Sequence, residues 1–133
     1  MRRSLKYLYV LLSLGFFGCN QLASQDGVFN VTAEKFKHLT SHKSVLVVDV
    51  RTPEEFEEGH IPNAINIDFL SKDFKPTIEK LDNKQPVYIY CRSGRRSSKS
   101  TVDFKKAGFS EIYNLQGGIQ EWKSLKFPIK HLE

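Results

Sequence analysis

Two runs of bulky apolar residues, at 44–50 and 86–90, constrain the fold of this chain more than any other feature. They are rich in β-branched or aromatic side chains, which is typical of strands that are covered on both faces. Helical patterns separate these runs from three shorter strand candidates. This alternation predicts an α/β fold, with a mostly parallel five-stranded sheet and helices on both faces.

The remaining elements are placed by their capping and turn residues. Thr32 and Thr52 are suited to cap helices, and Pro53 is suited to the first turn of the second one. Gly108 is a stop signal for a helix that precedes it. We expect strands at 28–31, 44–50, 64–67, 86–90 and 112–115, and helices at 32–39, from 52 onward, 76–81, 97–107 and 118–125.

The first 19 residues have the pattern of an export signal. Arg2, Arg3 and Lys6 form a basic start, and an apolar core of about ten residues follows, too short to span a bilayer. The core ends in Gly18-Cys19 and polar residues follow at once. This junction resembles the lipobox of bacterial lipoproteins, in which a diacylglycerol is attached to the cysteine and the chain is cut before it. A plain signal peptide or an uncleaved anchor is the alternative.

These features predict three parts: a lipoprotein-type signal peptide at 1–18, a polar tether at 19–27 and one domain at 28–128. Lipidation at Cys19 would anchor the exported protein in the cell envelope, on the periplasmic side of a membrane or at the cell surface. Cys91 would then have no partner for a disulfide within the chain. A lone thiol in an oxidising compartment is a liability unless its reactivity is used.

The net charge does not support nucleic-acid binding. The full chain carries +5, but cleavage before Cys19 lowers the basic residues from 20 to 17 against 15 acidic ones, which leaves +2. A nearly neutral domain offers no electrostatic footprint for a phosphate backbone. We therefore expect no nucleic-acid partner.

The loop at 91–96 carries the chemistry. Cys91 ends a predicted strand, Gly94 allows a tight turn, and three arginines lie within the next residues, close to the start of a helix. Backbone N–H groups of such a loop form a cradle for an anion, and they favour the thiolate form of a cysteine. Charge-assisted hydrogen bonds would hold an oxyanion substrate; the expected donors are Arg92, Arg95 and Arg96.

Two classes of enzyme use a thiolate in such a cradle. Phosphatases space their arginine six positions after the cysteine, where this chain has Ser97. The nearest arginine, Arg96, is one position too early, which disfavours a phosphatase or an arsenate reductase.

The loop sequence CRSGRRS, at 91–97, resembles the active-site loop of the rhodanese family of sulfurtransferases. Further motifs agree in order and spacing: Asp49-Val-Arg51 with Glu54 and Phe56, the stretches at 59–62 and 64–66, and the stretch at 115–118 followed by Trp122. Asn63 stands where the family usually has glycine, and asparagine also tolerates a left-handed turn. The resemblance spans about 28–125 and implies a rhodanese-like fold.

The resemblance also implies a sulfur transfer in two half-reactions. Cys91 would be the catalytic nucleophile, taking sulfur from a small anionic donor such as thiosulfate and passing it to an external thiol or cyanide. Arg92, Ser93, Gly94, Arg95, Arg96 and Arg51 would bind substrate, although orienting neighbouring loops is the favoured role for Asp49 and Arg51. His60 is interpreted as part of a structural turn. No metal or organic cofactor is expected, and we expect a monomer. The alternative is a rhodanese-like module that binds without catalysis.

Overall fold

The computed structural model of the 133-residue chain describes residues 24–42 and 44–133. The predicted signal peptide and Cys19 lie outside the described residues. Within the described ranges, no helix combines the length and the hydrophobicity needed to cross a bilayer.

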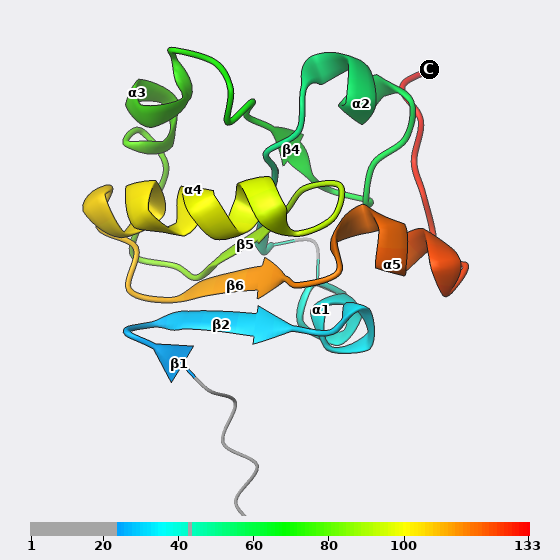
Figure 1. Cartoon of the computed structure of the whole chain (residues 1–133), viewed down its shortest axis with the longest axis horizontal. Helices are drawn as coiled ribbons and strands as arrows, with labels where there is room; N and C mark the ends of the chain where they lie inside the picture. Colours follow the sequence, from blue (N-terminus) through cyan, green and yellow to red (C-terminus); the bar gives the residue numbers. More distant parts are fainter. Residues whose placement is uncertain (1–23, 43) are drawn as a thin grey trace, which may run out of the picture.

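Six strands form one sheet, in the order β1-β2-β6-β5-β3-β4 (Figure 1). Five of them run parallel to their neighbours, which confirms the predicted parallel sheet. The strands are β1 (Ser24–Gln25), β2 (Val28–Val31), β3 (Leu46–Asp49), β4 (Ile65–Asn66), β5 (Val87–Tyr90) and β6 (Ile112–Leu115).

The short edge strand β1 was not predicted. It pairs antiparallel with β2 through a tight turn at Asp26 and Gly27, both of which have positive φ. The sheet therefore starts at Ser24, inside the segment assigned to the tether, four residues before the predicted start of the domain. A polar two-residue strand has no apolar pattern that would distinguish it from a linker.

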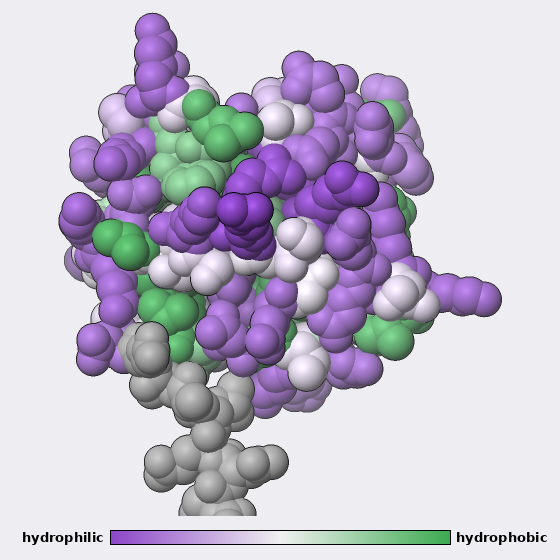
Figure 2. All heavy atoms as spheres, viewed as in Figure 1, coloured by the Kyte–Doolittle hydropathy of each residue, from purple (hydrophilic) through white to green (hydrophobic). Residues whose placement is uncertain are grey.

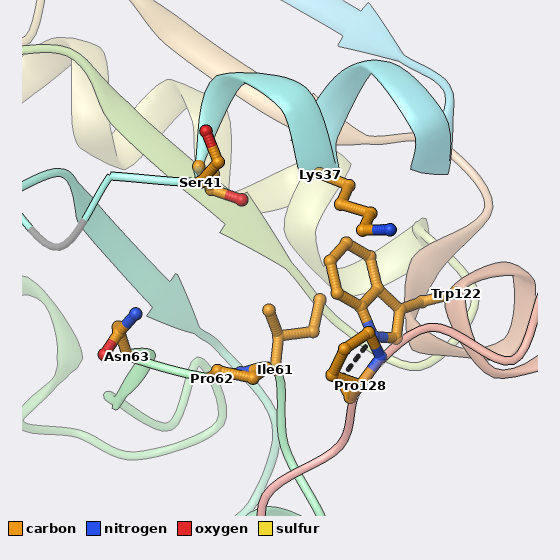
Figure 3. A pocket seen from close by; sticks show the side chains of 8 residues that line it. Lys37, Ser41, Ile61, Pro62, Asn63, Trp122 and Pro128 are labelled. Carbon is orange, nitrogen blue, oxygen red and sulfur yellow. Dashed lines mark hydrogen bonds between the residues drawn. The ribbon is translucent and has the colours of Figure 1, made fainter.

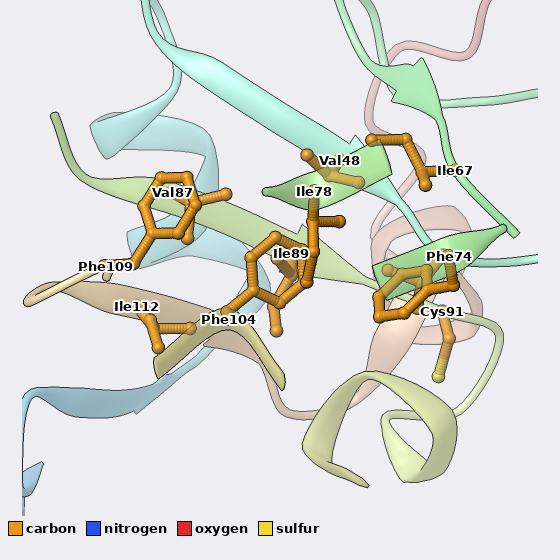
Figure 4. Packing of buried hydrophobic residues seen from close by; sticks show 11 residues of the cluster. Val48, Ile67, Phe74, Ile78, Val87, Ile89, Cys91, Phe104, Phe109 and Ile112 are labelled. Carbon is orange, nitrogen blue, oxygen red and sulfur yellow. The ribbon is translucent and has the colours of Figure 1, made fainter. Parts of the chain in front are cut away.

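Helices cover both faces of the sheet, as predicted (Figure 1). Phe74, Ile78 and Phe104 bring α3 and α4 against one face, in a core that includes Cys91 (Figure 4). Phe36 and Trp122 bring α1 and α5 against the other face, beneath the tyrosines of β5. The helices are α1 (Ala33–Leu39), α2 (Pro53–Glu57), α3 (Phe74–Ile78), α4 (Arg95–Lys106) and α5 (Gly118–Ser124).

Capping explains where most helices begin. The Thr32 hydroxyl accepts from the backbone N–H of Lys35, and Thr52 forms a reciprocal capping box with Glu55. Two helices differ from the predicted bounds. The third begins at Phe74 and ends at Ile78, because Pro76 is tolerated within the first turn rather than marking its start. The fourth begins at Arg95, two residues early, directly after the left-handed Gly94.

The C-terminal segment runs from α5 along one side of the domain and ends beside α2 (Figure 1). Trp122 Nε1 donates to the Pro128 carbonyl at 2.8 Å, above a small cavity that Ile61 and Lys37 also line (Figure 3). His60 and Lys130 exchange two backbone hydrogen bonds of 2.8 Å. The His60 ring stacks on Phe56, and its Nδ1 lies 3.1 Å from the Phe56 carbonyl oxygen. These contacts agree with a structural turn at His60.

Candidate active site

The Cys91 loop lies at the carboxyl end of the central strand β5. Ligands of open α/β sheets bind at this edge. Cys91 is 1% exposed, and the chain then turns through Gly94, whose φ of 95° suits glycine, into the first residue of α4. Gly94 also approaches the Gln116 carbonyl so closely that a Cβ would overlap it. The loop is thus held between the end of β6 and the start of α4.

Two hydrogen-bond donors point at the sulfur. The Gly94 backbone N–H donates to Cys91 Sγ at 3.1 Å, and Ser97 Oγ lies 3.5 Å from the same atom. Burial raises the pKa of Cys91, but hydrogen bonds from the Ser97 hydroxyl and from the loop amides outweigh burial, so the net pKa is lowered from its ordinary value. The site therefore favours the nucleophilic thiolate.

Ser97 was missed as a site residue by sequence reasoning. It is fully buried in the first turn of α4, and its hydroxyl also lies 3.3 Å from the Gly94 carbonyl. The signal was its position, since it stands where a phosphatase would place arginine. In this chain that position holds a neutral donor to the sulfur.

Replacing Ser97 with alanine should raise the pKa of Cys91, because the first contribution that offsets burial is the Ser97 hydroxyl. The measurement is the rate at which iodoacetamide alkylates Cys91 as a function of pH, followed by mass spectrometry of the Cys91 peptide. Ser98→Ala, at an exposed position one residue along, is the control. An unchanged pH profile in the Ser97 variant would show that the amides alone stabilise the thiolate.

Helix α5 supports the loop from the other side. The Ile119 N–H donates to the Cys91 carbonyl at 2.9 Å, and the Gln120 N–H donates to the Arg92 carbonyl at 3.1 Å. These amides belong to the first turn of α5 and have no partner within their own helix. Gly118, with a φ of 62°, allows the close approach. The loop carbonyls face α5, which leaves the amide of Gly94 free to face the sulfur.

The three loop arginines are not equivalent. Arg96 makes two hydrogen bonds to Glu55 of α2, at 2.7 and 2.8 Å, and is partly buried. Arg92 and Arg95 are exposed. The most hydrophilic surface on the face in Figure 2 lies across the middle of the molecule, over the α4 region. Arg92 thus has a free side chain at the site, whereas Arg96 ties α4 to α2.

The ion pair between Arg96 and Glu55 should make stability depend on pH. The hydrogen bond from Arg96 is the main cause that lowers the pKa of Glu55 from 4.5 to about 2, against the opposing effect of burial. Between pH 4.5 and about pH 2, Glu55 therefore binds a proton more readily in the unfolded chain than in the folded one. The stabilisation is therefore complete above about 4.5 and is lost as the pH falls towards 2.

Glu55→Gln tests this dependence because glutamine retains an acceptor for Thr52 but carries no charge. The free energy of unfolding, from urea titrations at a series of pH values, should be higher for the wild type near neutral pH. The difference between the two proteins should shrink through the stated window. A difference that stays constant with pH would contradict the assignment.

Arg51 lies at the same sheet edge, but its side chain is buried, with an exposed fraction of 4%. Its Nε and Nη2 atoms donate to the carboxylate of Asp49, and Nη2 also donates to the Gly59 carbonyl at 2.8 Å. Asn66 Nδ2 donates to the Arg51 carbonyl at 2.8 Å. These contacts agree with the favoured role of orienting loops, and Arg51 still forms part of the pocket wall.

A pocket of about 430 Å³ opens between α2, α5 and the Cys91 loop. Arg51, Arg92, Gln120 and Lys123 line it together with two glutamates of the α2 region. The structure thus brings Arg51 and Arg92 to one pocket, while Ser93, Gly94 and Arg95 lie along the loop. Across the described residues, no group of three or more His, Cys, Asp or Glu side chains is arranged to hold a metal ion.

Residues 32–125 match the family described as Rhodanese-like domain. The uncharacterized protein YqhL of Bacillus subtilis is 37% identical over 92 residues, which cover 69% of this chain and 70% of that protein. The thiosulfate sulfurtransferase GlpE of Coxiella burnetii is 33% identical over 86 residues, covering 65% and 78%. The tRNA uridine(34) hydroxylase of Pelagibacter ubique is 31% identical, but only 33% of its length is covered.

Solved structures show the same fold. The rhodanese-related protein of Thermoplasma volcanium superposes with a TM-score of 0.66 at 26% identity, covering 76% of this chain and 96% of that one. A rhodanese-like domain protein of Staphylococcus aureus superposes with a TM-score of 0.58 at 33% identity, covering 70% and 89%.

Proposed function

This chain belongs to the rhodanese-like domain family, and from that membership and the geometry of its Cys91 loop we propose that it is a sulfurtransferase. The observation that supports the proposal most is the buried Cys91 sulfur with the Gly94 amide 3.1 Å away and the Ser97 hydroxyl beside it. A buried structural cysteine would not need donors aimed at its sulfur. Relatives that are named as sulfurtransferases and are 33% identical to this chain support the same class of enzyme.

In the proposed first half-reaction, the Cys91 thiolate attacks the outer sulfur of thiosulfate. The new Sγ–S bond forms as the S–S bond of thiosulfate breaks, and sulfite leaves with the electron pair. The persulfide sulfur carries negative charge, which the amides of the loop and the first turn of α4 would stabilise. Helix α4 has no acidic residue in its first turn and no side-chain cap at Gly94, so its amides are available to an anion.

In the second half-reaction, a nucleophilic acceptor attacks the outer persulfide sulfur and the Cys91 thiolate is regenerated. Cyanide serves as the assay acceptor and a thiol as the proposed cellular one. Arg92 is the loop arginine best placed to bind an anionic donor, because Arg96 is paired with Glu55 and Arg95 is outside the pocket wall.

Incubation with thiosulfate tests the function directly. Mass spectrometry of the protein should show a gain of about 32 Da on the Cys91 peptide, and cyanide should remove that mass as thiocyanate. Absence of the adduct, with a folded protein, would favour the non-catalytic binding module. In separate assays, hydrolysis of a phosphate ester or reduction of added arsenate would support the disfavoured enzyme classes.

The N-terminal segment carries a separate proposal about location. The basic start, the short apolar core and the Gly18-Cys19 junction support processing to a chain that begins at a lipidated Cys19. Two or more acyl chains hold a protein firmly at a membrane. The domain should therefore stay in the membrane fraction through salt washes.

Intact-mass spectrometry of membrane-extracted protein measures both the first residue and the lipid mass. Cys19→Ala should remove the lipid and prevent cleavage by the lipoprotein peptidase. A mature chain that begins elsewhere, or a Cys19 without lipid, would refute envelope anchoring and leave the sulfurtransferase proposal intact.

A further inference from the structure

The pocket beside the Cys91 loop has an unusual balance of charge. Two of its charged side chains are already neutralised, Arg51 by Asp49 and Glu55 by Arg96. These two ion pairs connect parts of the fold, and each leaves almost no net charge. They contribute little net attraction to a ligand.

Three other charged side chains of the pocket wall are in no ion pair with any residue that the structure describes. Arg92 comes from the loop, Lys123 from α5 and Glu58 from the end of α2, and all three are exposed. The pocket thus offers two cations and one carboxylate to whatever enters it. The side-chain amide of Gln120 adds a neutral donor and acceptor to the same pocket wall.

Of these three charged side chains, the carboxylate of Glu58 says most about which ligand the pocket binds. The donor in the proposed function, thiosulfate, is a dianion, so Glu58 would repel it. A pocket that served only small anions would be better without this residue. A ligand that carries both an ammonium group and a carboxylate would instead satisfy all three charges. Glu58 would bind the ammonium group, and Lys123 with Arg92 would bind the carboxylate.

We propose that the sulfur acceptor is a low-molecular-weight thiol of the amino-acid type, recognised as a zwitterion by Glu58 and Lys123. This inference rests on the proposed sulfurtransferase function and names the acceptor class of that same site. The pocket borders the loop through Arg92, Ile119 and Gln120, the last two of which hydrogen-bond to the loop backbone. Cys91 is not among the residues of the pocket wall, so the thiol of a ligand bound there would have to reach from the pocket to the outer sulfur of a Cys91 persulfide.

The reaction balances without an added oxidant or reductant. The thiolate of the acceptor attacks the outer sulfur of the Cys91 persulfide, and a new S–S bond forms on the acceptor. The bond between Sγ and the outer sulfur breaks, and its electron pair returns to Sγ as the thiolate. The product is the persulfide of the amino-acid thiol, and its outer sulfur keeps the negative charge that it carried on Cys91.

The test isolates the second half-reaction. Wild-type protein is loaded with sulfur from thiosulfate, or from inorganic polysulfide if thiosulfate does not react, and loading is verified as a gain of about 32 Da on Cys91. The rate at which a thiol discharges the persulfide is then measured for four probes. L-Cysteine carries both groups, cysteamine only the ammonium group, mercaptopropionate only the carboxylate, and mercaptoethanol neither.

Two variants separate the two contacts. Glu58→Gln should slow discharge by L-cysteine and by cysteamine about fivefold and should not slow mercaptopropionate. Lys123→Gln should slow L-cysteine and mercaptopropionate by a similar factor and should not slow cysteamine. Each ratio compares variant with wild type for one thiol, so the intrinsic reactivity of the thiol cancels. Glu57→Gln and Lys99→Gln, exposed positions outside the pocket wall, are charge-matched controls.

The outcomes are distinct. Variant ratios that are equal for all four thiols, or that the controls reproduce, would overturn the zwitterion site while loading still supports the sulfurtransferase. A protein that takes up no sulfur from either donor would refute the proposed function, and this inference with it. A glutathione arm separates the two sources of the same chemistry, since a larger slowing by the two variants for glutathione than for L-cysteine would identify a peptide thiol as the acceptor.

Discussion

Cys91→Ser should reduce sulfur transfer to the background rate while the protein remains folded. In the proposed reaction the Cys91 thiolate is the nucleophile, and a hydroxyl in the same cradle forms no persulfide. The two donors at Sγ, the Gly94 amide and the Ser97 hydroxyl, can still hydrogen-bond to a serine oxygen. The loop should therefore keep its shape. The measurement combines thiocyanate production with the mass of the thiosulfate-treated protein.

The control for this variant is its thermal unfolding, which should stay close to that of the wild type. Cys91→Ala is a second variant that removes the hydroxyl as well. Thiocyanate production above background by either folded variant would show that another group carries the sulfur. The remaining cysteine, Cys19, makes the peptide-level assignment of the adduct necessary.

Gly118→Ala should cause the largest loss of stability of any single substitution considered for this domain. Gly118 has a φ of 62°, and a Cβ there would overlap the Arg92 carbonyl and lie 2.6 Å from the Ser93 backbone nitrogen. Backbone strain and overpacking each cost on the order of 1–3 kcal/mol, so we expect the free energy of unfolding to fall by about 2–6 kcal/mol. Urea denaturation measures this change.

The same substitution should also impair sulfur uptake. The first turn of α5 donates from Ile119 and Gln120 to the Cys91 loop, and displacing α5 breaks both hydrogen bonds. Uptake by the folded fraction, measured well below the unfolding temperature, should therefore be slower than in the wild type.

Gly108→Ala is the matched control, because Gly108 also has a positive φ of 98°. Its Cβ would meet the amide end of the exposed Asn83 side chain, which can rotate away if it gives up its hydrogen bond to the Ala107 carbonyl. The main remaining cost is the conformational strain, about 1–2 kcal/mol. Gly108 follows the C-terminal end of α4, whereas the loop precedes the N-terminal end of that helix. Equal losses in the two variants would show that crowding against the loop adds nothing at Gly118.

Much of the fold is readable from local patterns. The strands at Val87–Tyr90 and Ile112–Leu115 follow from apolar runs, and the helix at Pro53–Glu57 follows from its capping threonine and first-turn proline. Each of these signals depends only on a few residues that are neighbours in the sequence, so the elements can be predicted without the tertiary structure. The third helix was misplaced because Pro76 was interpreted as its start, although proline fits anywhere in a first turn.

The position of Cys91 at the edge of the sheet was also predictable. A parallel sheet brings the carboxyl ends of its strands to one side, so the residues that follow β3 and β5 share that side. Gly94 likewise indicates a left-handed backbone conformation, which other residues avoid. The sequence by itself thus determined the alternation of strands and helices along the chain, the α/β class and the position of Cys91 at the end of a central strand.

Only the tertiary structure decided which partner each charged side chain would take. Arg96 meets Glu55 across 41 positions of sequence, and Glu58 and Lys123 reach one pocket from α2 and α5. No local pattern encodes such pairings, because side-chain partners depend on how separate helices pack over the sheet. The same holds for Ser97, whose hydroxyl reaches the sulfur only because Gly94 turns the chain back into α4. The charge of a side chain and the reactivity of a thiol belong to single residues and can be identified from the sequence. Ion pairs and the hydrogen bonds that stabilise the thiolate depend on how those residues are arranged in space.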